Sequence, residues 1–160
     1  MSDELTFAIY PLQAAVKTRL EAHAYFSDIT VFTEEQGDLD SEIERALGML
    51  TEKGDKIGAC VVILTPIAKS KSPNAPGPLL DDFLFSINVL ENVLVNQGDD
   101  GTKKHAIQIV ELILRHLHRW TVPNTNAALH VAANAFTITN SDPLTYQVNF
   151  VTSLCLKPES

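Results

Sequence analysis

The side chains with the clearest potential for chemistry are three histidines in the carboxyl-terminal half of the chain, His105, His116 and His118. The surrounding pattern predicts one helix, on which residues two apart are separated by about 200° around the axis. His116 and His118 therefore cannot bind one metal ion together, and His105 is about three turns away from His116. We interpret these histidines as solvent-facing or helix-end residues whose positive charge complements the helix dipole.

Other residue combinations also give little support for catalysis. The acidic pairs at 81–82 and 99–100 do not match the spacing of a calcium-binding loop, and adjacent carboxylates on a strand point to opposite faces. Neither Cys60 nor Cys155 has a basic partner nearby in sequence, and there is no Gly-x-Ser-x-Gly elbow or glycine-rich phosphate loop. The sequence thus predicts no catalytic, cofactor-binding or metal site and a protein that is not an enzyme, although clusters assembled from distant positions stay open.

Composition indicates an acidic chain of single-domain size. The 160 residues carry 12 basic and 20 acidic side chains, a formal charge of −8, and this length fits one domain over 1–160. Negative charge disfavours nucleic acid as a partner and most simply serves solubility. We expect a cytosolic protein, because the acidic start has no signal-peptide core and no stretch reaches the roughly 20 apolar residues of a membrane helix.

Hydrophobic periodicity predicts alternating helices and strands in the first half of the chain. Leu12, Val16 and Leu20 recur at helical spacing. Both alternating sets of residues in ACVVILT are apolar, so this strand must be covered on both sides of a sheet. The predicted elements are a helix at 7–24, a strand at 29–33, a helix at 41–53 and a strand at 59–65.

A long alternating segment, Pro78–Asn96, is the least usual feature of the sequence. A strand of this length is close to twice the usual extent of roughly 5–6 residues. The proline- and serine-rich segment 69–78 before it predicts a flexible loop, which makes the two flanking strands a long hairpin with a mobile tip. One face of the long strand is apolar apart from Glu91; the other is mixed and includes Ser86, Asn88, Asn92 and Asn96.

The second half of the chain contains the clearest helix, Lys103–Trp120, with an apolar stripe that includes Ile107, Val110 and Leu114. Two strands follow, at 129–139 and 144–154. The second alternates apolar and polar residues and predicts a half-exposed antiparallel strand. We therefore expect an α+β fold: a mixed, mainly antiparallel sheet with a long β-hairpin, packed against two or three helices.

The order of these elements resembles the tail terminator, or tail completion, proteins of long-tailed bacteriophages and prophages. The resemblance covers about residues 7–156 and rests on SINVLENVLVN, the helix IVELILRHLHRW and the closing strand LTYQVNFVTSL. It implies a virion structural protein that forms a ring, in that family a hexamer, at the end of the tail tube. Such a ring stops tube polymerisation and provides the surface for head joining.

The resemblance also implies partners and a location. The partners would be other copies of the chain, the tail-tube protein and a head-completion or connector protein, while DNA passes through the ring without specific binding. The location would be the virion tail, after assembly in the host cytoplasm. We expect the contacts with a neighbouring subunit or the tube to involve the polar face of the long strand and the hairpin tip: Asn88, Glu91, Asn92, Asn96, Ser70 and Lys71.

Two alternatives stay open at this point. One is another virion connector of similar size, such as a head-completion or neck protein, which would bind on the portal side. The other is a small-molecule enzyme or binding protein built on an α+β domain, which would require a deep pocket with polar or titratable groups.

Overall fold

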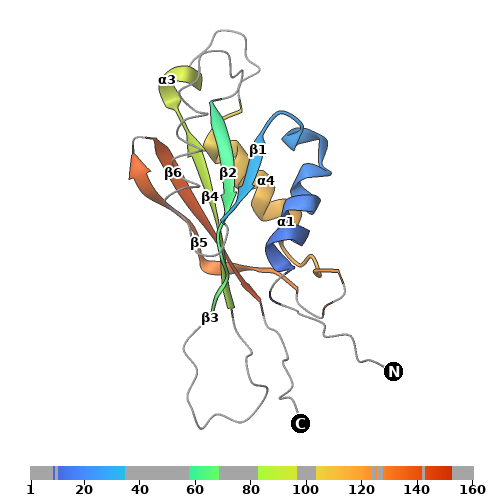
Figure 1. Cartoon of the computed structure of the whole chain (residues 1–160). Helices are drawn as coiled ribbons and strands as arrows, with labels where there is room; N and C mark the ends of the chain where they lie inside the picture. The colour runs from blue at the N-terminus through green and yellow to red at the C-terminus, as the bar shows by residue number, and fades with distance from the viewer. Residues whose placement is uncertain are drawn as a thin grey trace, which may run out of the picture.

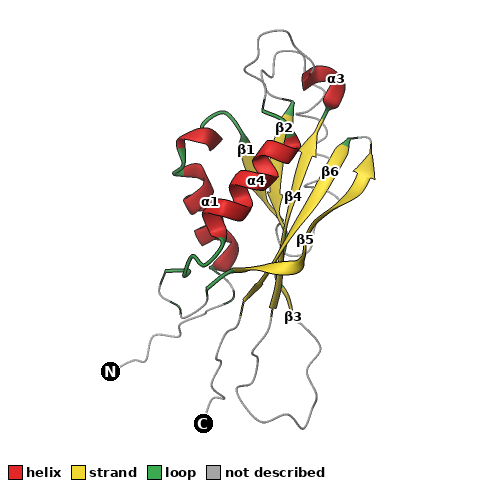
Figure 2. Ribbon diagram, turned by 180° about the vertical axis from the view of Figure 1, so that it is seen from behind, coloured by secondary structure: helices red, strands yellow, loops and turns green. Residues whose placement is uncertain are grey.

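The computed structural model has two layers, with two helices covering one face of a single sheet (Figure 1). It describes residues 9, 11–34, 58–68, 83–96, 104–123, 125, 128–141 and 143–152. Both main helices lie on the same side of the sheet (Figure 2). The helical elements are α1 (Leu12–Glu21), the 3-10 turn η1 (Ala24–Phe26), α3 (Val93–Asn96) and α4 (Ala106–Leu117).

The sheet is mixed and mainly antiparallel, with the strand order β1-β2-β4-β6-β5 and a short β3 beside the start of β4. Strands β1 and β2 run parallel, and the other described pairs are antiparallel. The predicted α+β class is confirmed. The strands are β1 (Thr30–Thr33), β2 (Ala59–Ile63), β3 (Ile67–Ala68), β4 (Phe83–Glu91), β5 (His130–Ser141) and β6 (Leu144–Thr152).

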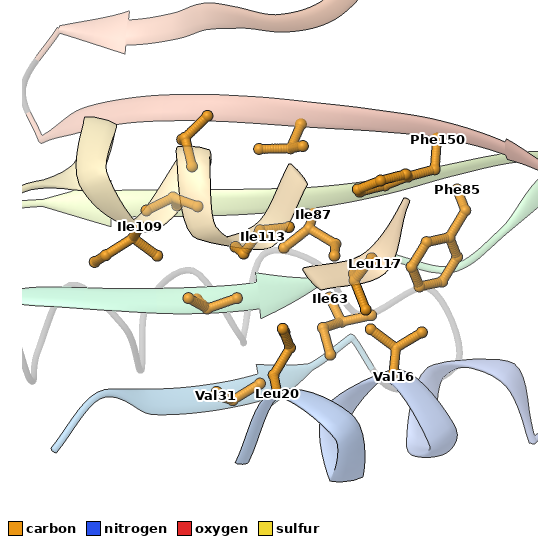
Figure 3. Packing of buried hydrophobic residues seen from close by; sticks show 14 of the residues in the cluster. Val16, Leu20, Val31, Ile63, Phe85, Ile87, Ile109, Ile113, Leu117 and Phe150 are labelled. Carbon is orange, nitrogen blue, oxygen red and sulfur yellow. The ribbon is translucent and has the colours of Figure 1, made fainter. Parts of the chain in front are cut away.

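The main core lies between the helices and the sheet (Figure 3). Leu12, Val16 and Leu20 project from α1 at helical spacing, and all three are buried. They meet Phe85 and Phe150, which lie opposite each other on β4 and β6. Burying one such side chain contributes about 1.5–3 kcal/mol relative to leaving it exposed, so this layer supplies most of the hydrophobic stabilisation.

The sequence-based prediction for β2 is confirmed, because all five of its residues are buried. Val61 and Ile63 belong to the core beneath the helices. Cys60 and Val62 lie on the opposite face, in a smaller cluster with Leu90 and Phe32. A strand that is apolar on both faces must occupy the interior of a sheet, and β2 lies between β1 and β4.

The prediction of one long strand from Pro78 to Asn96 is wrong at its carboxyl end. Strand β4 stops at Glu91, and the chain turns into the short helix α3. Glu91 is the last residue paired with both neighbours, opposite Ala59 on β2 and Leu144 on β6. The next backbone N–H, of Asn92, still bonds to Gly58 O at 2.7 Å, and a helical hydrogen bond from Asn96 N to Asn92 O then forms within α3.

The main helices are shorter than the sequence pattern predicts. Helix α1 begins after Pro11 and ends at Glu21. Helix α4 begins after His105, whose backbone N–H donates to Gln108 Oε1 at 2.9 Å. It ends where Arg119 takes a positive φ of 65°, a conformation that reverses the chain toward β5.

Ile107 is an exception to the predicted apolar stripe of α4, since it is 46% exposed. The residues of the helix that are buried are Ala106, Ile109, Val110, Ile113 and Leu117.

The two closing strands differ from the predicted regular hairpin. On β6, Val148 and Phe150 point into the core as expected, but Thr145 and Asn149 on the other face are also buried. Strand β5 departs from regular pairing between Val131 and Phe136, and this irregularity brings Asn134 O within 3.0 Å of Asn149 Nδ2. The bulge therefore satisfies a polar group on a face that alternation assigns to solvent.

Several predictions fall outside the described residues. These are the helix at 41–53, the loop at 69–78 with Ser70 and Lys71, and residue Cys155. Strands β2 and β3 both pair antiparallel with β4, as a hairpin requires, and the long hairpin with its tip stays a prediction. Among the helices that the structure describes, none has the length and apolar character needed to cross a bilayer.

Candidate interaction surfaces

Glu91, a residue expected at an intersubunit contact, lies inside the molecule and is 2% exposed. Its Oε1 accepts a hydrogen bond from Ala106 N at 2.9 Å and lies 3.3 Å from His105 Nδ1. The carboxylate thus satisfies a backbone donor at the amino terminus of α4, where the helix dipole favours negative charge. The Glu91 carboxylate therefore links the end of β4 to the start of α4.

The three predicted asparagines are distributed between the interior and the sheet face. Asn96 is 1% exposed, and its Nδ2 donates to Lys104 O at 3.0 Å. Asn92 is half-buried, with its backbone N–H 2.7 Å from Gly58 O. Asn88 is half-buried opposite Gln147 on β6, and its Oδ1 lies buried without a hydrogen-bond partner within the described chain. Asn88 is therefore the predicted contact residue on β4 with an unsatisfied polar atom.

A polar chain of hydrogen bonds crosses the sheet face opposite the helices. Ser86 Oγ donates to Asn149 Oδ1 at 2.8 Å, and Asn149 Nδ2 donates to Asn134 O at 3.0 Å. Ser86 and Asn149 are both buried, so each bond satisfies a group that would otherwise be costly. This network joins β4, β6 and β5 and accounts for polar residues that the sequence pattern assigned to solvent.

A hollow of about 780 Å³ lies between α1 and the end of α4. Arg19 Nε and Nη2 each donate to His116 O at 3.2 Å, and the guanidinium lies 4.9 Å from the centre of the Trp120 ring. The His23 and His116 rings meet edge to face at 4.9 Å. The other lining residues are mainly small or apolar: Pro11, Ala14, Ala15, Thr18, Ala22, Pro123 and Thr125.

The surroundings of His116 at this hollow lower its pKa below the ordinary value of 6.5. Partial burial between the helices is the main cause, and the positive charge of Arg19 is the second. The hydrogen-bonding contact of His116 Nε2 with Arg19 O, at 3.3 Å, opposes the shift, while His23 adds to it. The lowered pKa favours the neutral form of His116, which packs between α1 and α4.

The described residues do not gather three histidine, cysteine, aspartate or glutamate side chains in an arrangement that could hold a metal ion. At the α1–α4 hollow, the Arg19 donors are bonded to a backbone carbonyl and the Nδ1 of His23 accepts from Tyr25 N. The site can therefore accommodate an apolar group beside an aromatic ring and a cation, a geometry suited to binding.

A second, apolar groove lies between α4 and β5 and was not predicted from the sequence. It has a volume of about 430 Å³ and is lined by Ile107, Gln108, Val110, Glu111, Leu114 and Phe136. Ile107 and Phe136 are 46% and 43% exposed, and neighbouring Ile138 on β5 is 57% exposed. Such a cluster of exposed apolar side chains marks an interaction surface more often than scattered single residues do.

One sequence feature could have indicated this groove. Residues 131–141, VAANAFTITNS, contain no charged side chain, yet β5 is an edge strand of the described sheet. Edge strands are normally protected from pairing by charges, proline or covering elements. An uncharged edge therefore indicates a strand adapted to contact.

The fold and these surfaces are the findings that bear on function, because no protein-family model matches the chain and no curated protein matches it.

Proposed function

We propose that this protein is a virion structural protein that forms a ring at the end of a phage tail tube. In that position the ring stops further addition of tube subunits and presents its other side to the head. Its partners are other copies of the chain, the tail-tube protein and a head-completion or connector protein. The protein acts through contacts between surfaces.

The observation that carries the proposal is the exposed β5 edge together with the apolar groove beside α4. Phe136 and Ile138 alternate on one face of β5 and leave apolar surface open at the side of the molecule. An uncharged edge strand of this length favours unwanted pairing when the protein is a monomer, whereas in an assembly it can form a contact between subunits. The order of elements in the sequence resembles that of tail terminator proteins, and this resemblance is the reason for proposing a tail ring as the assembly.

The charge of the chain is compatible with a DNA passage. A formal charge of −8 gives like-charge repulsion with a DNA backbone, which lets DNA pass without binding.

The test combines the purified chain with a tail-tube protein from the same phage or prophage genome. Negative-stain electron microscopy should show short tubes with a ring of this protein at one end, and the tube length should fall as its concentration rises. Ile138→Asp should weaken this effect, because it places a charge on the β5 edge. Val93→Asp is the matched control, since Val93 is also an exposed apolar residue but lies in α3. An unchanged length distribution with bare tube ends contradicts the proposal.

A pull-down separates the tail position from a head-completion or neck position. The chain should retain tail-tube protein and should not retain portal or adaptor protein directly. The reverse result assigns the protein to the portal side of the virion.

The α1–α4 hollow favours one further candidate, a small-molecule binding domain. Its volume of about 780 Å³ lies within the usual range for ligand pockets, roughly 300–1,000 Å³. Screening small aromatic carboxylates by nuclear magnetic resonance, with Arg19 and Trp120 as reporters, tests this function. Saturable shifts confined to the hollow support it, and uniform absence of shifts contradicts it.

A further inference from the structure

We infer that one copy of this chain inserts Ile67 into the α4–β5 groove of the next copy, so that subunits join head to tail. This inference rests on the proposed ring and specifies its contact. The groove residues are Ile107, Val110, Leu114 and Phe136.

The groove has the chemistry to accept an aliphatic side chain. Val110 forms part of its buried floor, and Ile107 and Phe136 leave apolar surface exposed on its two sides. Phe136 is held in place by an edge-to-face contact with Tyr146, with ring centres 6.0 Å apart. The walls come from a helix and a paired strand, so the groove exists before any partner binds, which lowers the entropic cost of docking.

Ile67 is the most exposed of the large apolar residues that the structure describes, at 63%. It lies on the two-residue strand β3, which pairs with β4 opposite Leu84. Figure 1 shows β3 at the end of the sheet opposite to α3. The backbone pairing fixes the position of Ile67, so it can act as an apolar projection toward a partner.

The positions of these two surfaces favour a second copy as the occupant. Strand β3 lies on the β2 side of β4, whereas β5 forms the opposite edge of the sheet. Ile67 shares the face of Leu84, away from the helices, while the groove opens on the helix face. Two copies can therefore meet with overlapping edges, with the helix-face groove of one against Ile67 on the opposite face of the next.

A contact between two different surfaces of the same molecule repeats from copy to copy, and it closes into a ring when the rotation permits. An isologous contact, with groove against groove, would instead stop at a dimer.

The test uses two variants that each disable one surface, Ile67→Asp and Ile107→Asp. An aspartate at Ile107 lies in the first turn of α4, where negative charge is tolerated. Sedimentation velocity over a concentration series should show wild-type oligomers and a roughly tenfold to hundredfold weaker association for each variant, the range expected for losing one buried isoleucine.

Val93→Asp should assemble like the wild type. Circular dichroism establishes that every variant is folded, and Ile67→Ser and Ile107→Ser replace any that is not.

Mixing the two variants gives the decisive result. The Ile67→Asp chain keeps its groove and the Ile107→Asp chain keeps its projection, so an equimolar mixture should form a 1:1 dimer that grows no further. A mixture that stays monomeric overturns the inference, as does a wild type that is monomeric at millimolar concentration. Assembly that is lost in Ile107→Asp and kept in Ile67→Asp also overturns it, in favour of groove against groove.

The inference and the proposed function can fail separately. Head-to-tail pairing of the variants without capping of tail tubes sustains the contact and removes the tail function. Capping of tubes by chains that carry both substitutions sustains the tail function and removes the contact.

Discussion

Strands β4 and β5 have similar sequence character and opposite environments. Both alternate apolar residues with serine, threonine or asparagine, and both are longer than an average strand. Yet seven of the nine positions of β4 are buried and the strand pairs on both sides, whereas most of β5 is exposed. The environment of each strand follows from its place in the sheet.

This comparison changes which part of the molecule is suited to meet a partner. Two polar residues of β4, Glu91 and Ser86, satisfy groups within the chain. The apolar residues of β5, Phe136 and Ile138, face outward. A polar residue on a strand is thus weak evidence for an interface, while an exposed apolar residue on an uncharged edge is stronger evidence.

The largest effect should come from the end of β4. Glu91→Ala removes a charged acceptor from the start of α4 and leaves Ala106 N without its bond. We expect the free energy of unfolding to fall by about 1.5–3 kcal/mol, the range for a hydrogen bond to a charged group. Urea denaturation measures it. Glu91→Gln, which keeps an acceptor oxygen, should lose less; equal losses would show that size and not the hydrogen bond matters.

A smaller effect should follow from the polar network between β4 and β5. Asn149→Ala leaves Ser86 Oγ and Asn134 O without their partner and should cost about 1–2 kcal/mol. Thr137→Ala on the exposed part of β5 is the matched control and should stay within about 0.5 kcal/mol of the wild type. Similar losses for both variants would remove the distinction between the buried and the exposed polar faces.

A dependence on pH should come from the packed part of the molecule, because residues 131–141 of β5 contain no titratable side chain. Folding lowers the pKa of His116, so the unfolded chain binds its proton more readily. Stability therefore decreases as pH falls below about 6.5 and is unaffected by this group well above that value. His116→Gln should show a shallower fall in thermal melting temperature between neutral pH and pH 5. An identical slope in the variant contradicts this assignment.

The smallest effect on stability should come from the β5 edge itself. Ile138→Thr keeps a β-branched side chain and removes exposed apolar surface, so the free energy of unfolding should change by no more than about 0.5 kcal/mol. The same substitution should weaken self-association in sedimentation experiments. A large loss of stability would mean that Ile138 supports the fold, and the contrast between β4 and β5 would then disappear.

Much of the fold could be predicted from local pattern. The α1 stripe, the doubly buried β2 and the core face of β4 follow from periodicity, because a side chain's direction along a helix or strand depends only on its position in the chain. The ends of the elements could not be predicted in this way. β4 stops at Glu91, where its pairing with β2 and β6 ends, and Ile107 falls outside the core because of how α4 lies on the sheet.

The sequence by itself determined the α+β class, the acidic charge and the apolar faces that form the core, since these depend on composition and on local geometry. The tertiary structure decided which of two similar strands became the edge, which polar residues found partners and where apolar surface stayed open. The physical reason is that burial and hydrogen bonding depend on neighbours far away in the chain, such as Asn134 for Asn149 and Ala106 for Glu91. Alternation along one strand specifies two faces, and only the assembled sheet determines what lies against each.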